Sequence, residues 1–368
     1  MTGEGLSEPL QPPACHFSSA RSVFAVEHPN RPRRDVNGND HQADAAVNEV
    51  MNRKLCSLSS SVGAVAILTG CMTGSQASLP PPLANSIAQS RVTSGATLRK
   101  DDLLYVADSA ASAVYVYRWR TGALKQTLTG FNGVNGVCAD RSGNVWIANA
   151  GASDLQEYAH GGTQPIASLS DPGEFPFSCS IDPASGDLAV TNLNASYHGG
   201  NVGIYAKAGG APRFYTDSKF HSYFSSAYDD KGNLFVDGAD KRKHFAFAEL
   251  VRGSQTLTDI KLHKLPAKIL IAGGVQWDGK YIALGSQLSP AAIYQIRVAG
   301  SIGTVVGTTP LDEVQIVIGF WKQGSKVVAP DALAGEINFY DYPSGGDPIK
   351  VISHSGEPVA AVVSKGAE

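Results

Sequence analysis

The hydrophobic and polar positions of the sequence follow one phrase that returns at nearly even spacing. An apolar run leads to an Asp, a short turn with a Gly follows, and a second apolar run leaves the turn. Clear copies cover residues 134–148, 177–190, 227–236 and 275–283, and a degenerate copy covers residues 319–328. Their turn glycines, from Gly143 to Gly324, are 43, 46, 47 and 45 residues apart. A period in the forties with strand–turn–strand units is typical of β-propeller blades.

A further copy of the phrase is divided between the two ends of this repeat region. Residues 102–108 match only its second half, and residues 357–366 match only its first half. With these pieces the sequence holds six first halves and six second halves. We therefore predict an all-β, six-bladed β-propeller with ring closure by the C-terminal strand, which completes the first blade.

Each blade is expected to have an inner strand, a second strand and two outer strands. In blade four the outer strands are predicted over residues 244–250 and 257–262. The inner strands are predicted to enter the ring at Asn135, Phe177, Phe224, Gly273, Val317 and Glu357. The second strands are predicted to start at Leu103, Val145, Leu188, Leu234, Tyr281 and Val327.

The N-terminal quarter has a different composition. Residues 1–50 are polar and lack an apolar period, so we expect them to be disordered or untranslated, with Met51 as the start in the latter case. Residues 51–70 have a basic start, an apolar stretch and small residues before Cys71, as in an export signal. Residues 71–97 are expected to be a linker, and residues 98–368 the propeller.

The end of this signal, Leu68-Thr-Gly-Cys71, resembles the lipobox of bacterial lipoproteins. The resemblance implies that Cys71 is lipidated and becomes the first residue, which places the protein at a membrane face, at the outer membrane or cell surface rather than in the cytoplasm. A plain signal peptide or a chance apolar stretch are the alternatives.

The propeller region itself has family-like phrases. Tyr105-Val-Ala-Asp108, Ala189-Val-Thr-Asn192 and the Asp-x-x-Gly-Asn turns resemble NHL/YVTN-type six-bladed propellers of bacteria. Residues 157–162, 232–238 and 342–346 resemble phrases in a group of uncharacterised exported bacterial lipoproteins, and the likeness spans residues 98–364. It implies a fold but no particular function, because propellers include binders and enzymes.

A more distant similarity is to gluconolactonase and regucalcin-like propellers. It would imply a divalent cation such as calcium at the channel mouth, held by Glu, Asn and Asp side chains, that polarises a lactone carbonyl. Among the inner-strand entries only Asn135 and Glu357 carry suitable oxygens, with Asn192 or Asp237 as further candidates. These four residues form the candidate channel-mouth site, and the metal remains unassigned.

Polar residues also end the second strands of successive blades. Asp108, Asn149, Asn192 and Asp237 could together line one face of the propeller. The favoured interpretation is structural: each side chain accepts hydrogen bonds from its own hairpin turn, as Asp and Asn commonly do after strands.

Two further features carry candidate chemistry. Cys138 and Cys179 lie on neighbouring inner strands; an exported protein could join them, but we expect buried free thiols. Lys241, Arg242 and Lys243 form a basic hairpin in blade four, which is either a solvated edge or a contact patch for anionic lipid or polymer. The net charge of −3 gives no reason to expect a nucleic-acid partner.

These observations predict a lipid-anchored extracytoplasmic propeller that acts as a binding scaffold. Its partner would be an envelope protein, a polymer or a small ligand held by one propeller face. The alternative function is a metal-dependent lactonase or related hydrolase at the channel mouth.

Overall fold

The computed structural model of the protein describes residues 101–193, 199–269, 271–288 and 290–366. The predicted signal peptide, the lipidation residue Cys71 and the linker lie outside these residues. Within the described ranges nearly all regular structure is β-strand, and no helix there has the length and apolar character needed to cross a membrane.

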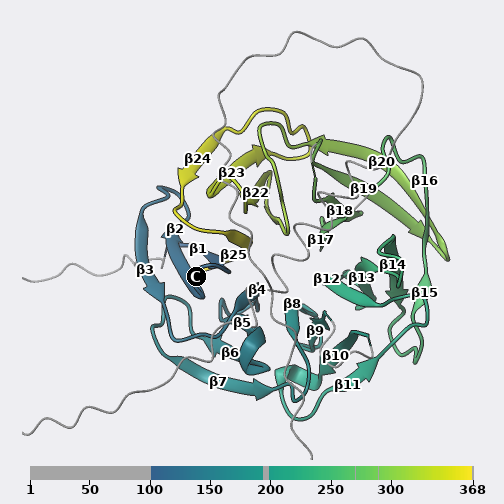
Figure 1. Cartoon of the computed structure of the whole chain (residues 1–368), viewed down its shortest axis with the longest axis horizontal. Coiled ribbons are helices and arrows are strands. Elements are labelled where there is room, and N and C mark those ends of the chain that lie inside the picture. Colours follow the sequence, from purple (N-terminus) through teal and green to yellow (C-terminus); the bar gives the residue numbers. More distant parts are fainter. Residues whose placement is uncertain (1–100, 194–198, 270, 289, 367–368) are drawn as a thin grey trace, which may run out of the picture. The chain divides into compact units, whose positions relative to one another are not determined.

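The described strands form six sheets arranged around a central axis, as Figure 1 shows. From the inner to the outer strand, blade one consists of β25 (Pro358–Ser364), β1 (Leu103–Asp108), β2 (Ala113–Arg118) and β3 (Leu124–Leu128). Blade two consists of β4 (Val134–Ala139), β5 (Val145–Asn149), β6 (Asp154–Tyr158) and β7 (Pro165–Ser170). Blade three consists of β8 (Pro176–Ile181), β9 (Leu188–Asn192), β10 (Asn201–Tyr205) and β11 (Arg213–Tyr215).

The remaining blades follow the same order. Blade four consists of β12 (Ser222–Tyr228), β13 (Leu234–Ala239), β14 (Phe245–Leu250) and β15 (Thr258–Asp259). Blade five consists of β17 (Ala272–Trp277), β18 (Ile282–Ser286), β19 (Ala292–Ala299), β20 (Ile302–Pro310) and β16 (Lys261–His263). Blade six consists of β21 (Trp321–Gln323), β22 (Lys326–Asp331), β23 (Glu336–Asp341) and β24 (Lys350–Ser353). Among the described residues, two single-turn 3-10 helices, η1 (Ala150–Ala152) and η2 (Ala206–Ala208), lie in connections.

The predicted ring closure is confirmed. The C-terminal strand β25 pairs antiparallel with β1, from Leu103 opposite Ser364 to Asp108 opposite Pro358. Every residue of β1 is buried, because neighbouring blades cover both faces of this strand. Its Tyr105 packs in one cluster with Val362 of β25 and with Val137 and Ile147 of blade two.

The outer strand of blade four differs from the prediction over residues 257–262. Only β15 pairs with β14, while β16 crosses to blade five and pairs in parallel with β20. Ile260, between these short strands, is buried in the cluster that contains Ile296 and Tyr294 of blade five. Burial of this side chain between two blades therefore divides the predicted strand into two pieces.

The inner strand of blade six also differs from the prediction. It begins at Trp321 rather than at Val317. The backbone N–H of Val317 donates to the carbonyl of Gln287 in blade five, and Gln315 N–H donates to the Asp331 carboxylate. The Val317 N–H is therefore not available for pairing within a longer inner strand of blade six.

The antiparallel order gives the ring two distinct faces. At the entry face the chain enters each inner strand from the preceding blade, and the second strands end there. At the exit face lie the turns that join inner to second strands in blades two to six, such as the turn in which Asp140 accepts the N–H of Asn144. The two faces are used below to place each candidate residue.

Candidate functional site

A cavity of about 290 Å³ opens along the propeller axis on the side of the exit face. All six blades contribute to its lining through their inner strands, and blade six contributes Trp321, the first residue of β21, with the preceding Gly319 and Phe320. The hydroxyls of Ser180 and Ser226 lie 2.8 Å apart in its wall. Trp277 and Trp321 lie half-buried beside them. No residue that lines this cavity carries a charged side chain, so its walls offer hydroxyls, backbone groups and aromatic rings.

The mouth of this cavity is held in place between blades five and six. The Gln276 side-chain amide donates to the backbone oxygen of Lys322 at 3.4 Å, and the Lys322 ammonium donates to the backbone oxygen of Asp278 at 2.7 Å. These contacts tie β17 to β21, which are otherwise not paired strands. These ties restrict the movement of the wall that contains Trp277 and Trp321.

The entry end of the axis is narrow. A space of about 30 Å³ remains there, bordered by Asn135, Phe177 and Ile318. The rings of Phe177 and Phe224 meet edge to face with centroids 5.7 Å apart, which narrows this end further. The buried amide nitrogen of Asn135 has no hydrogen-bond partner among the described residues. Thus the larger opening lies at the exit face, opposite the face where the sequence suggested a site.

The four candidate channel-mouth residues do not converge. Asn135 borders the narrow space, whereas Glu357 is exposed on the entry face and accepts a hydrogen bond from Ser109 at 2.9 Å. Asn192 and Asp237 are fully buried within blades three and four, and neither lines the axial cavity. The described residues contain no group of three His, Cys, Asp or Glu side chains able to hold a metal ion. These dispersed side chains do not fit the calcium ion that the sequence suggested, because calcium is usually bound by six or more oxygen ligands at one position.

The polar residues at the second-strand ends act as internal ties. Asp108 accepts the N–H of Ala111 in its own hairpin at 2.9 Å and the N–H of Glu357 at 3.2 Å. Asn149 accepts the N–H of Asn132 at 2.6 Å. Glu357 and Asn132 each lie in the connection that leads into an inner strand, β25 and β4 respectively. The hydrogen bonds favour the structural interpretation and extend it, because each side chain joins a hairpin or strand end to an incoming connection.

Among these second-strand residues, Asp237 has the carboxyl group whose pKa is shifted most by the protein. Burial raises the pKa of Asp237 to about 7, although the backbone N–H of Ser225 donates to it at 2.7 Å and opposes the shift. Its second oxygen is buried without a hydrogen-bond partner in the described part of the chain. Because β13 and its neighbours enclose this group, the shift reflects burial in a structural position rather than access to a substrate.

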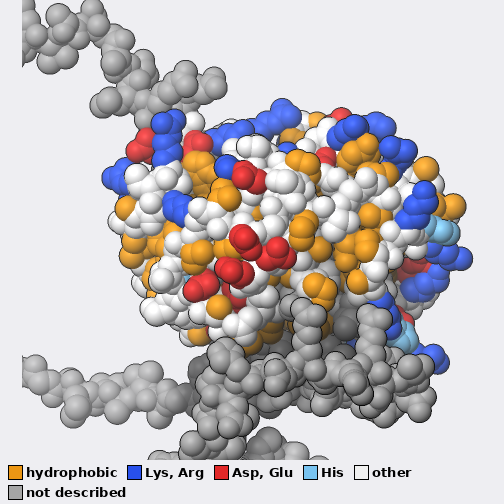
Figure 2. Space-filling model, turned by 90° about the horizontal axis from the view of Figure 1, so that it is seen from above, with side chains coloured by type: hydrophobic (Ala, Val, Ile, Leu, Met, Phe, Trp, Pro, Cys, Tyr) orange, Lys and Arg blue, Asp and Glu red, His pale blue; other side chains and the backbone are white. Residues whose placement is uncertain are grey.

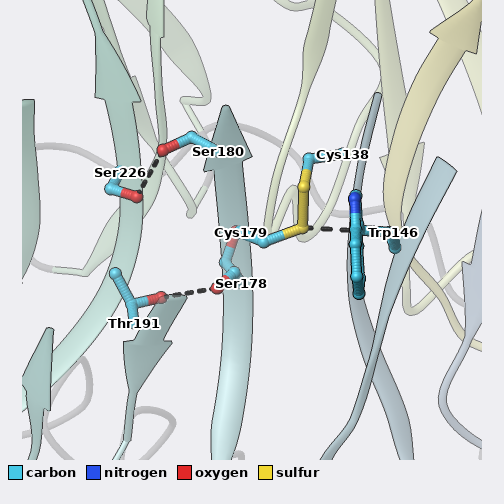
Figure 3. The surroundings of a disulfide bond; sticks show 7 residues. All are labelled: Cys138, Trp146, Ser178, Cys179, Ser180, Thr191 and Ser226. Atoms are coloured by element: carbon cyan, nitrogen blue, oxygen red, sulfur yellow. Dashed lines mark hydrogen bonds between the residues drawn. A yellow bond between two sulfur atoms is a disulfide. The ribbon is translucent and has the colours of Figure 1, made fainter. Parts of the chain in front are cut away.

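Cys138 and Cys179 form a disulfide, with Cα atoms 5.6 Å apart (Figure 3). The expectation of free thiols was therefore wrong. The one-residue offset between them relative to the repeat is what allows the bond, because side chains alternate between sheet faces and the two cysteines must project from opposite faces of neighbouring blades. Gly136 permits this approach: a Cβ there would lie 2.5 Å from the Ser178 Cα.

The disulfide belongs to the wall of the axial cavity. Both cysteines line it, and the Cys179 sulfur lies 3.8 Å from the backbone oxygen of Trp146 (Figure 3). On the other side of β8, the Thr191 hydroxyl donates to the backbone oxygen of Phe224 at 2.8 Å. Blades two, three and four are thus joined near the axis by covalent and hydrogen bonds.

The basic hairpin is exposed, as the charge pattern suggested. Lys241, Arg242 and Lys243 form the turn between β13 and β14 on the entry face. Asp240 fixes this turn by accepting the N–H groups of Arg242 at 2.7 Å and His244 at 2.8 Å. Exposed basic residues continue along the same part of the molecule at Lys261, His263, Lys264 and Lys268. Figure 2 shows Lys, Arg and His side chains gathered along one edge of the propeller.

Comparisons with known proteins support the fold and no narrower class. No protein-family model matches the sequence, and no curated protein matches it. A chain in the crystal structure of a nidogen/laminin complex is similar with a TM-score of 0.58 and 10% identity, over 72% of this chain and 98% of that chain. A protein of unknown function from Bacteroides caccae is similar with a TM-score of 0.56 and 13% identity, over 72% of this chain and 99% of that one. The molecule is a six-bladed β-propeller, a class whose rigid ring suits a binding or scaffold role.

Proposed function

We propose that this protein is a lipid-anchored, exported binding protein that holds its partner at the exit face of the propeller. The uncharged axial cavity carries the proposal. Its serine hydroxyls and half-buried tryptophans provide hydrogen bonds and apolar contact, but no side chain of its lining can exchange a proton near neutral pH. Such a surface is suited to recognition rather than to acid–base chemistry.

The partner is an envelope protein, a polymer or a small ligand that places an uncharged group in the cavity mouth. Aromatic residues at a rigid rim are efficient anchors because they bury a large area with little loss of side-chain freedom. A similar fold is present in the nidogen/laminin complex, and this supports recognition of a protein by a propeller face.

Export is supported by the disulfide between Cys138 and Cys179. Structural disulfides persist in oxidising compartments and are rare in the cytosol. Together with the signal-like residues 51–70 and Cys71, this favours a mature protein that is tethered outside the cytoplasm.

The test is site-specific photo-crosslinking in intact cells of the producing organism. A photoreactive residue is placed at the exposed exit-face positions Arg141 and Lys280, and at the exposed entry-face positions Lys241 and Ser355 as matched controls. We expect a discrete adduct from the exit-face positions that disappears when Ser180→Tyr narrows the cavity mouth. Adducts from the entry face alone, or adducts that survive Ser180→Tyr in a folded protein, would contradict the proposal.

The alternative lactonase function lacks support from the geometry. Asn135 and Glu357 occupy separate places on the entry side, and no carboxylate or histidine lines either axial space. A hydrolase of that type would need several oxygen ligands in one position to hold its cation.

A second candidate role is favoured by the exposed basic residues of blades four and five. The hairpin Lys241–Lys243 is pinned by Asp240, so its cations are presented on an ordered turn. Each cation near an anionic membrane contributes about 1 kcal/mol. Replacement of Lys241, Arg242 and Lys243 by Ala should then weaken co-sedimentation with vesicles containing anionic lipid, while binding to neutral vesicles stays unchanged; equal binding of both forms to anionic vesicles would exclude this role.

A further inference from the structure

A second cavity, of about 220 Å³, lies between blades three and four at the exit face. Apolar side chains form part of its wall, including Ile204, Leu234 and Leu250. Its charged lining is balanced: two carboxyl groups, Asp182 and Asp187, share it with two guanidinium groups, Arg213 and Arg252.

Tyr228, the last residue of β12, lies where this cavity approaches the axial one. Only 9% of Tyr228 is exposed, and its buried hydroxyl has no hydrogen-bond partner among the described residues. Burial, followed by the negative charges of Asp187 and Asp182, raises the pKa of Tyr228 well above its usual value. The hydroxyl therefore remains a hydrogen-bond donor, and it lacks an acceptor among the described residues, which is unfavourable for a buried polar group.

The two arginines also have unused donors. The Arg213 guanidinium lies over the ring of Tyr215, 5.3 Å from its centroid, which restricts its position. Arg252 packs beside Gly232, where a Cβ would lie 3.2 Å from the Arg252 Cδ. Within the described ranges neither guanidinium has a carboxylate within ion-pair distance.

The two carboxylates differ in what they can still accept. Both carboxylate oxygens of Asp182 already accept hydrogen bonds within its own turn, from the Ala184 N–H at 2.9 Å and from the Ser185 hydroxyl at 2.7 Å. Asp187 accepts the Lys207 N–H at 2.8 Å through one oxygen. The other oxygen of Asp187 is the carboxylate position best able to receive a donor from a ligand.

We propose that this cavity binds a small zwitterion of amino-acid size. The ligand carboxylate would accept hydrogen bonds from Arg213, Arg252 and the Tyr228 hydroxyl, and its ammonium group would face Asp187. A simple anion would meet two carboxylates, and a simple amine would meet two guanidinium groups, so only a ligand with both charges complements the whole lining. The apolar wall accepts an aliphatic side chain. Tyr228 also borders the axial cavity, but the two carboxylates and two guanidinium groups line only this one, so its ligand does not depend on the partner proposed for the axial cavity.

The test uses three probes that differ only in their charged groups. L-leucine carries both charges, 4-methylpentanoate lacks the ammonium group, and 3-methylbutylamine lacks the carboxylate. Binding to the purified full chain is measured by saturation-transfer NMR and calorimetry at roughly 10 mM, because a ligand this small is expected to bind with a Kd of about 1 mM. L-glutamine and glycine are included to cover other side chains.

We expect L-leucine or another of the zwitterions to bind and both single-charge probes to bind about tenfold more weakly or not at all. Tyr228→Phe and Arg252→Ala should each weaken binding about tenfold, whereas Arg141→Ala, an exposed arginine on the exit face of blade two, should leave it unchanged. Circular dichroism verifies that each variant is folded.

Three results would overturn the proposal. The first is that none of the zwitterions binds. The second is that 4-methylpentanoate binds as tightly as L-leucine, which would make the site a simple anion site. The third is that folded Tyr228→Phe and Arg252→Ala proteins bind as the unaltered chain does.

Discussion

The Nε2 atom of His354 lies 2.8 Å from a carboxylate oxygen of Asp108, and both side chains are buried. His354 stands just before the C-terminal strand β25, and Asp108 ends β1, the strand with which β25 pairs. The other ring nitrogen of His354 lies 2.8 Å from the Tyr117 hydroxyl on β2. The contact therefore fixes the final connection of the chain to the blade that closes the ring.

Replacing Asp108 by Asn should destabilise the protein at neutral pH by about 1–3 kcal/mol. An amide cannot accept at both of its positions, so it cannot serve His354 and the N–H groups of Ala111 and Glu357 together. The exposed Asp101, which pairs with Arg118, provides the control: Asp101→Asn should change stability by less than about 1 kcal/mol. Urea denaturation at pH 7 measures both differences.

The effect of Asp108 should depend on pH. Burial opposes ionisation, but the hydrogen bonds from His354, Ala111 and Glu357 together hold the pKa of Asp108 below its ordinary value of 3.8. Since the folded-state pKa is the lower one, the carboxylate stabilises the fold above pH 3.8, and this contribution is lost as the pH falls through the folded value. The gap between wild type and Asp108→Asn should shrink in acid; a constant gap would show that ionisation of Asp108 is irrelevant.

Asp237→Asn should have the opposite pH dependence. Burial raises the pKa of Asp237 from 3.8 to about 7, so its contribution is fully present below pH 3.8 and is lost as the pH rises through 7. Asn resembles the protonated acid, so the variant should become more stable than wild type, by about 2–4 kcal/mol at pH 8 and by much less at pH 5. Thermal unfolding at both pH values measures this, with the exposed Asp230→Asn as control. A larger gain at pH 5 than at pH 8 would refute the assignment.

The disulfide should contribute about 4 kcal/mol, because it closes a loop with a sequence separation of 41 residues. Reduction with dithiothreitol should lower the urea midpoint of wild type and leave Cys138→Ala/Cys179→Ala unchanged. The double variant should already unfold at the midpoint of the reduced wild type. Equal midpoints for oxidised and reduced wild type would show that the bond does not stabilise the ring.

The six-bladed ring was predictable from the sequence because each repeat forms its turn through residues that are close together in the chain. The Asp and Gly of each phrase form a turn whatever surrounds it, and Gly143 adopts the expected positive φ of 85°. The division of one phrase between residues 102–108 and 357–366 was enough to predict the pairing of β25 with β1. The predictions for the strands now seen as β16 and β21 were wrong because these strands depend on packing between blades. The repeat spacing within the sequence contains no information about that packing.

The candidate site was harder to predict for the same reason. Sequence placed Asn135 and Glu357 near an axis but did not reveal that Phe177 and Phe224 narrow that end. The polar wall of the wider end comes from small residues such as Ser180 and Ser226, which have no distinctive spacing. The disulfide had a usable signal: two cysteines on neighbouring inner strands, offset by one residue, are in phase to face each other.

The proposed lipid anchor leads to a prediction about Cys71, which lies outside the described residues. If Cys71 is lipidated, the unaltered protein should sediment with membranes and be released by detergent, and Cys71→Ser should accumulate as an unprocessed precursor or leave the membrane fraction. Cys56→Ser changes a cysteine inside the predicted signal and should have no such effect. Fractionation with intact-mass analysis distinguishes these forms. If Cys71→Ser and the unaltered protein show the same processing and the same membrane association, the anchor is not at Cys71 and the lipoprotein proposal is wrong.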